Sequence, residues 1–300
     1  MAILFALAAS ITNAFATILQ RLGVQHAPDD TSFSWQLVMH ALRQPVWLAG
    51  TATMTGGYVL QFLALSYAGL SVVEPVLTLE LVFLVAILGI WFNQTLGWQD
   101  WVGAMAITVG LGGFLYAASP SGGNSIPASL SWIEAFVVVL AAASVTALLA
   151  ARGGPWWRAS LLGVSSALFF SLAAASTKVA TAYLKSGGWL SLLTHWQTYG
   201  IVIAGGAGLF VLQHAYRAGP ITASQSALMI VDPLASILIG VSLFDERVRS
   251  SGARGPLEAL ALLGMFSGVI LLSKSPVVVE AKAAAEGISL DSPPARKAAH

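Results

Sequence analysis

The sequence predicts an all-α protein that crosses a membrane several times. The expected architecture is a polytopic bundle of about nine transmembrane helices, built from two inverted four-helix repeats joined by a linking span. Three observations predict this fold class. The composition is 57% hydrophobic and only 9% charged, whereas soluble domains carry about 25% charged residues. Long apolar stretches separated by short breaks run along most of the chain, and polar residues of the first half recur at a fixed offset in the second.

The composition also limits the classes of function. A water-facing surface is built mainly from polar and charged groups, so lipid must be the solvent for most of this chain. The net charge is +1, and without a basic cluster we expect no nucleic-acid partner. The chain contains no cysteine, which excludes disulfides, zinc–thiolate sites and thiol nucleophiles.

Nine stretches are long and apolar enough to span a membrane, because a hydrocarbon core about 30 Å thick needs roughly 20 apolar residues per helix. In chain order they are residues 2–22, 46–66, 71–92, 98–117, 131–151, 159–184, 196–216, 221–244 and 257–273. Breaks rich in Gly, Pro, Ser and Asn separate them, at residues 68–69, 93–95, 119–123, 153–155, 186–188, 218–220 and 251–256.

The remaining segments are assigned by length and composition. Segments 33–43 and 189–194 are apolar but too short to span, so we expect interfacial or re-entrant pieces. Residues 276–300 are rich in Ala, Lys, Glu and Pro, and we expect a disordered C-terminal tail. The first span has no basic residue before it, and Arg21 lies at its C-terminal end. It is therefore interpreted as an uncleaved first helix rather than a signal peptide.

The distribution of basic residues predicts the orientation. Odd-numbered loops and the C-terminal tail hold nine Lys or Arg residues, whereas even-numbered loops hold four, three of them in one loop. Cytoplasmic loops carry the excess of basic residues. We therefore expect a multi-pass protein of the cell (cytoplasmic) membrane, with its N-terminus outside and its C-terminus in the cytoplasm.

An internal repeat relates the two halves of the chain. An offset of 152 residues takes Val59-Leu60-Gln61 to Val211-Leu212-Gln213, Glu80 to Asp232, and Gln94 to Glu246. Apolar helices resemble one another by chance, but matched polar residues at one offset argue for a true repeat.

The repeat divides the chain into four parts. Residues 1–117 form a first repeat, residues 118–158 hold the linking span and its loops, residues 159–275 form a second repeat, and 276–300 is the tail. Each repeat has four spans, and an odd linking span inverts the second copy relative to the first. Many secondary transporters use this arrangement to alternate access around a site at the membrane midplane.

Two matched segments resemble a known family. AGLSVVEPVLTLELVFLVAIL (68–88) and AGPITASQSALMIVDPLASILIG (218–240), each followed by a Gly-rich closing helix, are similar to the drug/metabolite transporter (DMT) superfamily with its EamA-like inverted repeats. The resemblance covers roughly residues 1–275 and implies transport, without naming a substrate. The glutamate that usually closes the fourth helix of each EamA repeat stands here as Glu246 but is Gln94 in the first half.

The layout is closest to one branch of that superfamily. The second helix of an ordinary EamA repeat is reduced here to residues 33–43 and 189–194. Nine spans, and a first helix ending in Gln20-Arg21, resemble the NIPA-like magnesium transporters. This resemblance implies Mg²⁺ as an alternative substrate to a small polar metabolite or another cation.

Glu80 and Asp232 are the leading candidates for a substrate or ion site. Each lies about halfway along its span, at matched positions of the repeat. A carboxylate at a helix centre costs about 2.5–3.5 kcal/mol on insertion scales, so it needs a partner or a use. Two such acids on inverted helices are expected to face one cavity and to coordinate a cation or exchange protons. The alternative is that each accepts hydrogen bonds that hold the bundle together.

Further polar residues are candidates for lining this site. Glu74 precedes Pro75, which removes a backbone donor and should distort the span, and Gln225 takes the related place in the second half. Lys178 lies near the end of the sixth span and either snorkels to the interface or pairs with Asp232 or Glu80. The remaining candidates are Gln61, Gln213, Asn13, Gln20 and Tyr58. Bridging between helices is the more frequent role of such amides.

These observations favour a secondary transporter that works without a cofactor. No enzyme signature is present, because the chain contains neither an HExxH motif nor a phosphate-binding Gly loop ending in Lys-Ser. The expected partners are a small-molecule or ion substrate and the lipid bilayer, and a homodimer stays open. A membrane scaffold or assembly subunit, with the acids as structural contacts, is the alternative from another class.

Overall fold

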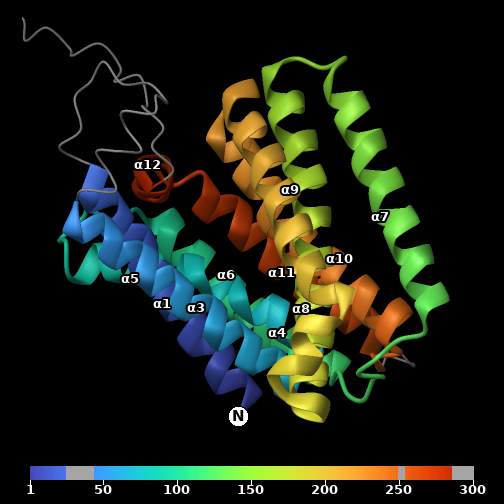
Figure 1. The fold of residues 1–300 in the computed structure, drawn as a ribbon. Coiled ribbons are helices and arrows are strands. Elements are labelled where there is room, and N and C mark those ends of the chain that lie inside the picture. The colour runs from blue at the N-terminus through green and yellow to red at the C-terminus, as the bar shows by residue number, and fades with distance from the viewer. Residues whose placement is uncertain (25–43, 249–253, 286–300) are drawn as a thin grey trace, which may run out of the picture.

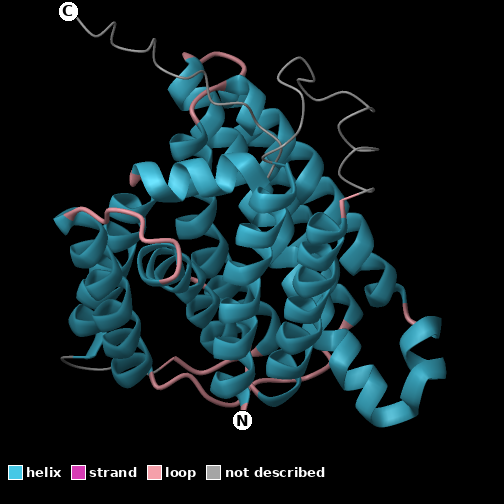
Figure 2. Cartoon of the chain, turned by 90° about the vertical axis from the view of Figure 1, so that its left-hand side faces the viewer, coloured by secondary structure: helices cyan, strands magenta, loops and turns pink. Residues whose placement is uncertain are grey.

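The computed structural model describes residues 1–24, 44–248 and 254–285, with the side chains of Arg21, Gly23, Val24 and Ala285 left out. Over these residues the fold is all-helical, and Figure 2 shows helices joined by short loops. The helices are α1 (Ala2–Val24), α3 (Pro45–Tyr67), α4 (Leu70–Leu77), α5 (Leu79–Ile90), α6 (Trp98–Ala118), α7 (Ser129–Ala150), α8 (Pro155–Thr194), α9 (Trp196–Ala218), α10 (Ile221–Phe244), α11 (Arg254–Ser273) and α12 (Pro276–Ala285).

Eight segments in the described part of the chain are long and apolar enough to cross a membrane. They are α1 over Ala2–Gln20, α4 and α5 together over Leu70–Ile90, and helices α6, α7, α8, α9, α10 and α11. The protein is therefore a multi-pass helical membrane protein. The predicted span at 46–66 is helix α3, which has 23 residues but is less apolar, because threonines and glycines occupy its first half.

The two halves of the chain lie on opposite sides of the bundle (Figure 1). Helix α1 packs against α3 in the first half as α8 packs against α9 in the second. Between the halves, α4 packs against α10, and α6 packs against α11. Helix α7 lies at the edge of the bundle and contacts mainly α8. Its outer side chains, such as Ile133, Val138 and Leu148, are more than half exposed, as expected for a surface that faces lipid.

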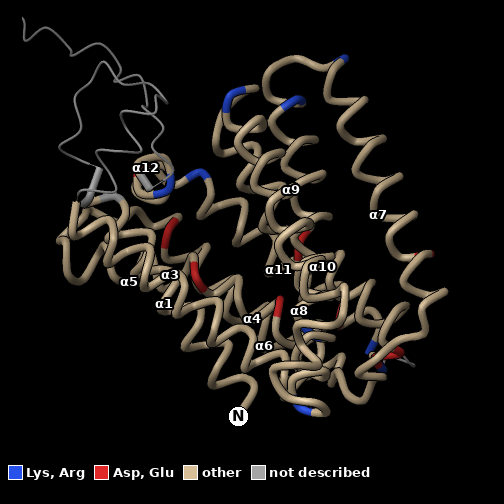
Figure 3. The backbone as a smooth tube through the Cα atoms, in the orientation of Figure 1, with Lys and Arg blue, Asp and Glu red and all other residues tan. Residues whose placement is uncertain are grey.

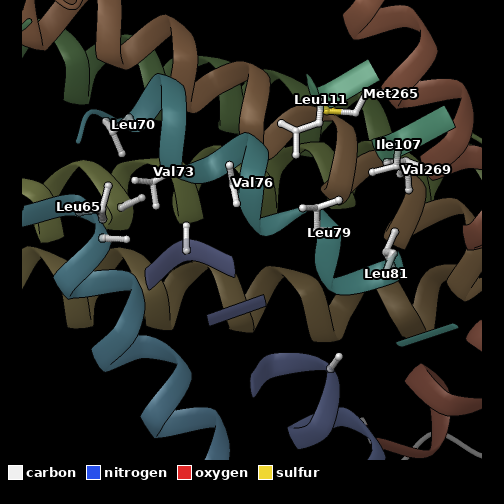
Figure 4. Packing of buried hydrophobic residues seen from close by; sticks show 14 of the residues in the cluster. Leu65, Leu70, Val73, Val76, Leu79, Leu81, Ile107, Leu111, Met265 and Val269 are labelled. Atoms are coloured by element: carbon white, nitrogen blue, oxygen red, sulfur yellow. The ribbon is translucent and has the colours of Figure 1, made fainter. Parts of the chain in front are cut away.

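Glycines allow the close contact between α6 and α11. A Cβ atom at Gly268 would lie 2.6 Å from the Gly103 carbonyl oxygen and 2.8 Å from the Ile107 nitrogen. Both of these neighbours are backbone atoms and cannot move aside. Small residues commonly let transmembrane helices approach in this way. Figure 4 shows Ile107 of α6 and Val269 of α11 packed in the same core as Val76 of α4.

Proline interrupts the third span, as the sequence predicts. The span divides at Thr78 into α4 and α5, three residues after Pro75. The Thr78 hydroxyl donates a hydrogen bond to the Pro75 carbonyl oxygen at 2.7 Å. From α1, the Ser10 hydroxyl lies 3.2 Å from the Val76 carbonyl oxygen. Side chains thus partner the carbonyls at the break, which separates Glu74 from Glu80.

Beyond the ends of α5 and α10, the chain makes a similar turn. Asn93 and Asp245 adopt left-handed conformations with φ of 48° and 53°. The next residue in each case returns a hydrogen bond to a carbonyl six residues earlier, from Gln94 N to Leu88 O at 3.1 Å and from Glu246 N to Gly240 O at 3.0 Å. These positions are related by the 152-residue offset of the sequence repeat.

Two expectations for the short segments need correction, and one is not covered. Residues 276–285 were expected in a disordered tail but form helix α12, whose apolar residues pack against α1 and α5; residues 286–300 lie outside the described part. The break at 186–188 is a kink rather than a helix end, because Gly188 takes φ 67° and α8 continues to Thr194. Segment 33–43 lies outside the described residues.

Candidate functional site

Glu74 is a buried acid on α4 that a glutamine from α3 holds in place. Glu74 is 5% exposed, and its Oε1 accepts a hydrogen bond from Gln61 Nε2 at 3.0 Å. Burying a carboxylate costs free energy unless it is paired and hydrogen-bonded. Gln61 is a neutral amide, so this hydrogen bond brings no positive charge to offset the Glu74 carboxylate.

Asp232 of α10 interacts electrostatically with Glu74 across the contact between α10 and α4. Its Oδ1 is buried and has no hydrogen-bond partner. The hydroxyl of Ser236, one turn further along α10, is also buried without a partner. Two acids and an unsatisfied hydroxyl therefore gather where the halves meet, and Figure 3 shows acidic positions inside the bundle whereas most basic ones lie at its ends. Such a group favours a proton or a cation that neutralises it.

The acid near Asp232 is Glu74 rather than Glu80. Glu80 lies in the first turn of α5 and forms an ion pair with Lys282 of α12. Six residues of α-helix correspond to about 600° of rotation, so Glu74 and Glu80 face in different directions. The two acids also have different partners, Gln61 for Glu74 and Lys282 for Glu80. The repeat offset suggested Glu80 as the partner of Asp232. An offset gives the depth of a residue along its helix but not the direction of its side chain.

Lys178 pairs with Glu246, which differs from both expectations for it. The lysine is 8% exposed, so it does not snorkel to the interface. Its Nζ lies 2.5 Å from Glu246 Oε1 and 4.1 Å from the centre of the Phe244 ring. Glu246 also accepts hydrogen bonds from the backbone N–H groups of Leu70 and Ser71, each at 2.9 Å. Because those groups begin α4, the carboxylate caps that helix and stabilises its N-terminus.

Glu246 fits into a cradle of glycines. A Cβ atom at Gly69 would lie 2.4 Å from the Glu246 carboxyl group, and one at Gly240 would lie 2.6 Å from it. A pocket of about 270 Å³ adjoins the ion pair and is lined by Lys178, Glu246 and the loop 120–125, among others. The loop is fixed by paired backbone hydrogen bonds between Ser121 and Arg247. Glu246 therefore joins α4, α8 and the loops at one end of the bundle.

Of the other predicted residues, Gln225, Gln20 and Asn13 contact neighbouring helices. The Gln225 amide donates a hydrogen bond to the Tyr216 hydroxyl, and Gln20 contacts the Met54 sulfur at 3.6 Å. Asn13 packs against Gly57, where its Oδ1 lies 2.0 Å from the place of an added Cβ. Gln213 is half-buried in α9. Tyr58 is 53% exposed and does not belong to the buried group.

Two charged residues that form ion pairs, Glu246 and Lys282, are not among the site residues predicted from the sequence. The repeat carries a signal for Glu246, because it matches Gln94 immediately after a helix end. Gln94 itself is exposed, so the two matched positions play different parts. Lys282 has no such signal, since it follows the last span in a segment of tail-like composition.

Comparison with known proteins shows one extended likeness. The chain is 29% identical over 275 residues to an uncharacterized protein of Corynebacterium glutamicum, covering 92% of this chain and 95% of that protein. The likeness therefore runs along almost the whole membrane bundle. No family model matches the chain. No solved structure matches it either.

Proposed function

We propose that the protein is a secondary transporter of the drug/metabolite type, which moves a small cation or small polar metabolite by alternating access between residues 1–117 and 159–273. The observation that carries the proposal is the pair Glu74 and Asp232. These acids come from different halves, interact electrostatically, and leave Asp232 Oδ1 buried without a partner. Ionisable side chains within membrane spans almost always face the bundle interior rather than lipid, and there they mark ion or substrate pathways.

Two features support inverted repeats as the mechanical basis. The pairings α1–α3 and α8–α9 occupy equivalent places in the two halves, and equivalent helices also meet in α4–α10 and α6–α11. The matched ends of α5 and α10 add a local likeness that apolar composition does not explain. In such transporters the halves rock about a midplane site built on interrupted helices, and the break at Thr78 supplies an interrupted helix beside Glu74.

The charge environment favours a cation over an organic anion. Lys178 would have argued for an anion or for proton coupling had it paired with one of the site acids. Its partner is Glu246 instead, and within the described ranges no salt bridge joins Glu74 or Asp232 to a lysine. Among the described residues, no group of three or more His, Cys, Asp or Glu side chains forms a metal site. Mg²⁺ therefore stays an alternative substrate that the experiment below includes.

The proposal is tested by neutralising each acid without changing its shape. Wild type, Glu74→Gln and Asp232→Asn are reconstituted into vesicles, and charge movement is recorded on addition of Na⁺, Mg²⁺, methylammonium or a proton gradient. The exposed Glu134 of α7 provides the matched control Glu134→Gln. We expect at least one probe to move charge through wild type and Glu134→Gln, with a loss of tenfold or more in both site variants.

Two outcomes would overturn the proposal. If Glu74→Gln and Asp232→Asn keep the wild-type currents, the acids are structural contacts. If folded wild type moves none of the probes, the membrane scaffold becomes the better interpretation. Monodispersity in detergent, measured for all four proteins, separates loss of transport from loss of folding.

A further inference from the structure

Helix α12 lies outside the spans yet contributes buried side chains to the bundle. It packs against α1, α5, α10 and α11. Val278, Ala281 and Ala283 are at most 3% exposed, so the helix buries apolar side chains against these spans. A short helix that buries such a face is held by the membrane bundle rather than by its own hydrogen bonds.

Lys282 carries a positive charge from this helix into the bundle. Its ammonium group forms an ion pair with Glu80, and the two side chains are only 12% and 14% exposed. Glu80 lies close to the middle of the span Leu70–Ile90. An acid at this depth is therefore neutralised by a cation that belongs to the chain's own C-terminal helix.

A small cavity adjoins Lys282 beside this ion pair. It has a volume of about 10 Å³ and is lined by Leu81, Ile221, Gln225, Ser273, Val278, Val279 and Lys282. That volume is at the lower limit for holding a single water molecule. Ser273 is one of the lining residues, and its hydroxyl is buried without a hydrogen-bond partner. An ammonium group has three donors, and an ammonium bound here needs acceptors besides the Glu80 carboxylate. The Ser273 hydroxyl is a candidate for the second acceptor.

We propose that α12 is an inhibitory helix whose Lys282 ammonium occupies a binding site for primary ammonium cations at Glu80. The site accepts an external cation of that class when Lys282 leaves it. The inhibitory role rests on the proposed transport function, whereas the cation site at Glu80 is separate from the Glu74–Asp232 pair. Glu80 supplies the charge, and the Ser273 hydroxyl supplies a neutral acceptor.

Tethering explains why the lysine prevails over free cations. A group on a short tether competes at an effective concentration in the millimolar range. A cation that binds Glu80 weakly is therefore excluded until α12 moves. Removing the Lys282 side chain while keeping the helix should convert the blocked site into an open one, because alanine is the best helix former.

The first test measures binding of methylammonium as the probe. Thermal unfolding of the full chain in detergent is followed at increasing methylammonium chloride, with NaCl holding the ionic strength constant. Lys282→Ala should show a saturable rise in midpoint, whereas wild type and the exposed-lysine control Lys274→Ala should show none. The double variant Lys282→Ala/Glu80→Gln should lose the rise. No saturable rise in folded Lys282→Ala, or an equal rise in the double variant, overturns the proposal.

The second test measures access to the cavity directly. The chain contains no cysteine, so Ile221→Cys places a single thiol in the cavity lining. A cationic methanethiosulfonate should label it at least tenfold faster when Lys282→Ala is added, and methylammonium should slow that labelling. Equal labelling rates with and without Lys282 overturn the inhibitory role. Both tests need no transport, so they fail independently of the Glu74 and Asp232 variants.

Discussion

At the scale of single residues, Glu246 shows how one carboxylate joins distant parts of the chain. It accepts two backbone hydrogen bonds from the start of α4 and pairs with Lys178 of α8. Breaking a buried pair on one side leaves the other charge uncompensated, which is costlier than the pair itself is stabilising. The two helix-cap hydrogen bonds reduce this cost but do not remove it.

We predict that Lys178→Met lowers stability, because Glu246 then stays buried without its cation. The expected loss is about 3–5 kcal/mol, the usual effect of removing one partner of a buried pair. It is measured as a lower unfolding midpoint in detergent, with the exposed Lys274→Met as control. Adding Glu246→Gln to Lys178→Met should recover part of the loss. A Lys178→Met protein as stable as the control would show that the ion pair contributes little.

At the scale of helices, side-chain volume decides which elements pack closely. Helices α6 and α11 approach through Gly103 and Gly268, whereas Gly264 of the same α11 has no neighbour within 4 Å of an added Cβ. The two glycines of α11 therefore look alike in the sequence but have different surroundings. Overpacking a close contact typically costs about 1–3 kcal/mol, while Gly→Ala in an open helical position gains about 0.5–1 kcal/mol.

We therefore predict opposite effects for one substitution at two places on α11. Gly268→Ala should lower the unfolding midpoint, because its methyl group would press on the backbone of Gly103 and Ile107. Gly264→Ala should leave the midpoint unchanged or raise it slightly. The midpoints of thermal unfolding of both variants and of wild type, measured in one detergent, test this prediction. Equal effects would mean that α6 and α11 are less closely packed than described.

At the scale of the whole molecule, the direction of the chain across the membrane follows from the number of spans. Five spans, α7 to α11, lie between Ser119 and Pro276. An odd number places these residues on opposite sides. The excess of basic residues in odd-numbered loops and the tail predicts that Pro276 faces the cytoplasm.

We predict that reporter fusions after Ser119 and after Pro276 give opposite orientations, with Ser119 outside and Pro276 inside. Alkaline phosphatase is active outside, and a cytoplasmic fluorescent reporter is active inside. A fusion after Arg152, which lies one span beyond Ser119, should agree with Pro276. Fusions at Ser119 and Pro276 on the same side would show that one of the five helices does not cross.

The sequence by itself determined the solvent of the protein and the position of its helices. Apolar stretches of membrane length have few alternatives to helix, because lipid offers no hydrogen bonds to the backbone. Pro75 predicts the break that the third span shows at Thr78, because its nitrogen has no hydrogen to donate to the helix. The repeat offset also marked α5 and α10 as related, and their ends share one geometry. All of this information is local in the chain.

Only the tertiary structure decided which charges meet. Repeat offset and depth suggested Glu80 with Asp232, but the rotation of each helix about its axis places Glu74 near Asp232 and Glu80 against Lys282. Lys178 pairs with Glu246, 68 residues away in the sequence, because α8 packs beside α4 and α10. Helix α12 folds only because the bundle buries its apolar face. Partner choice depends on helix rotation and packing, and no local pattern of residues encodes either.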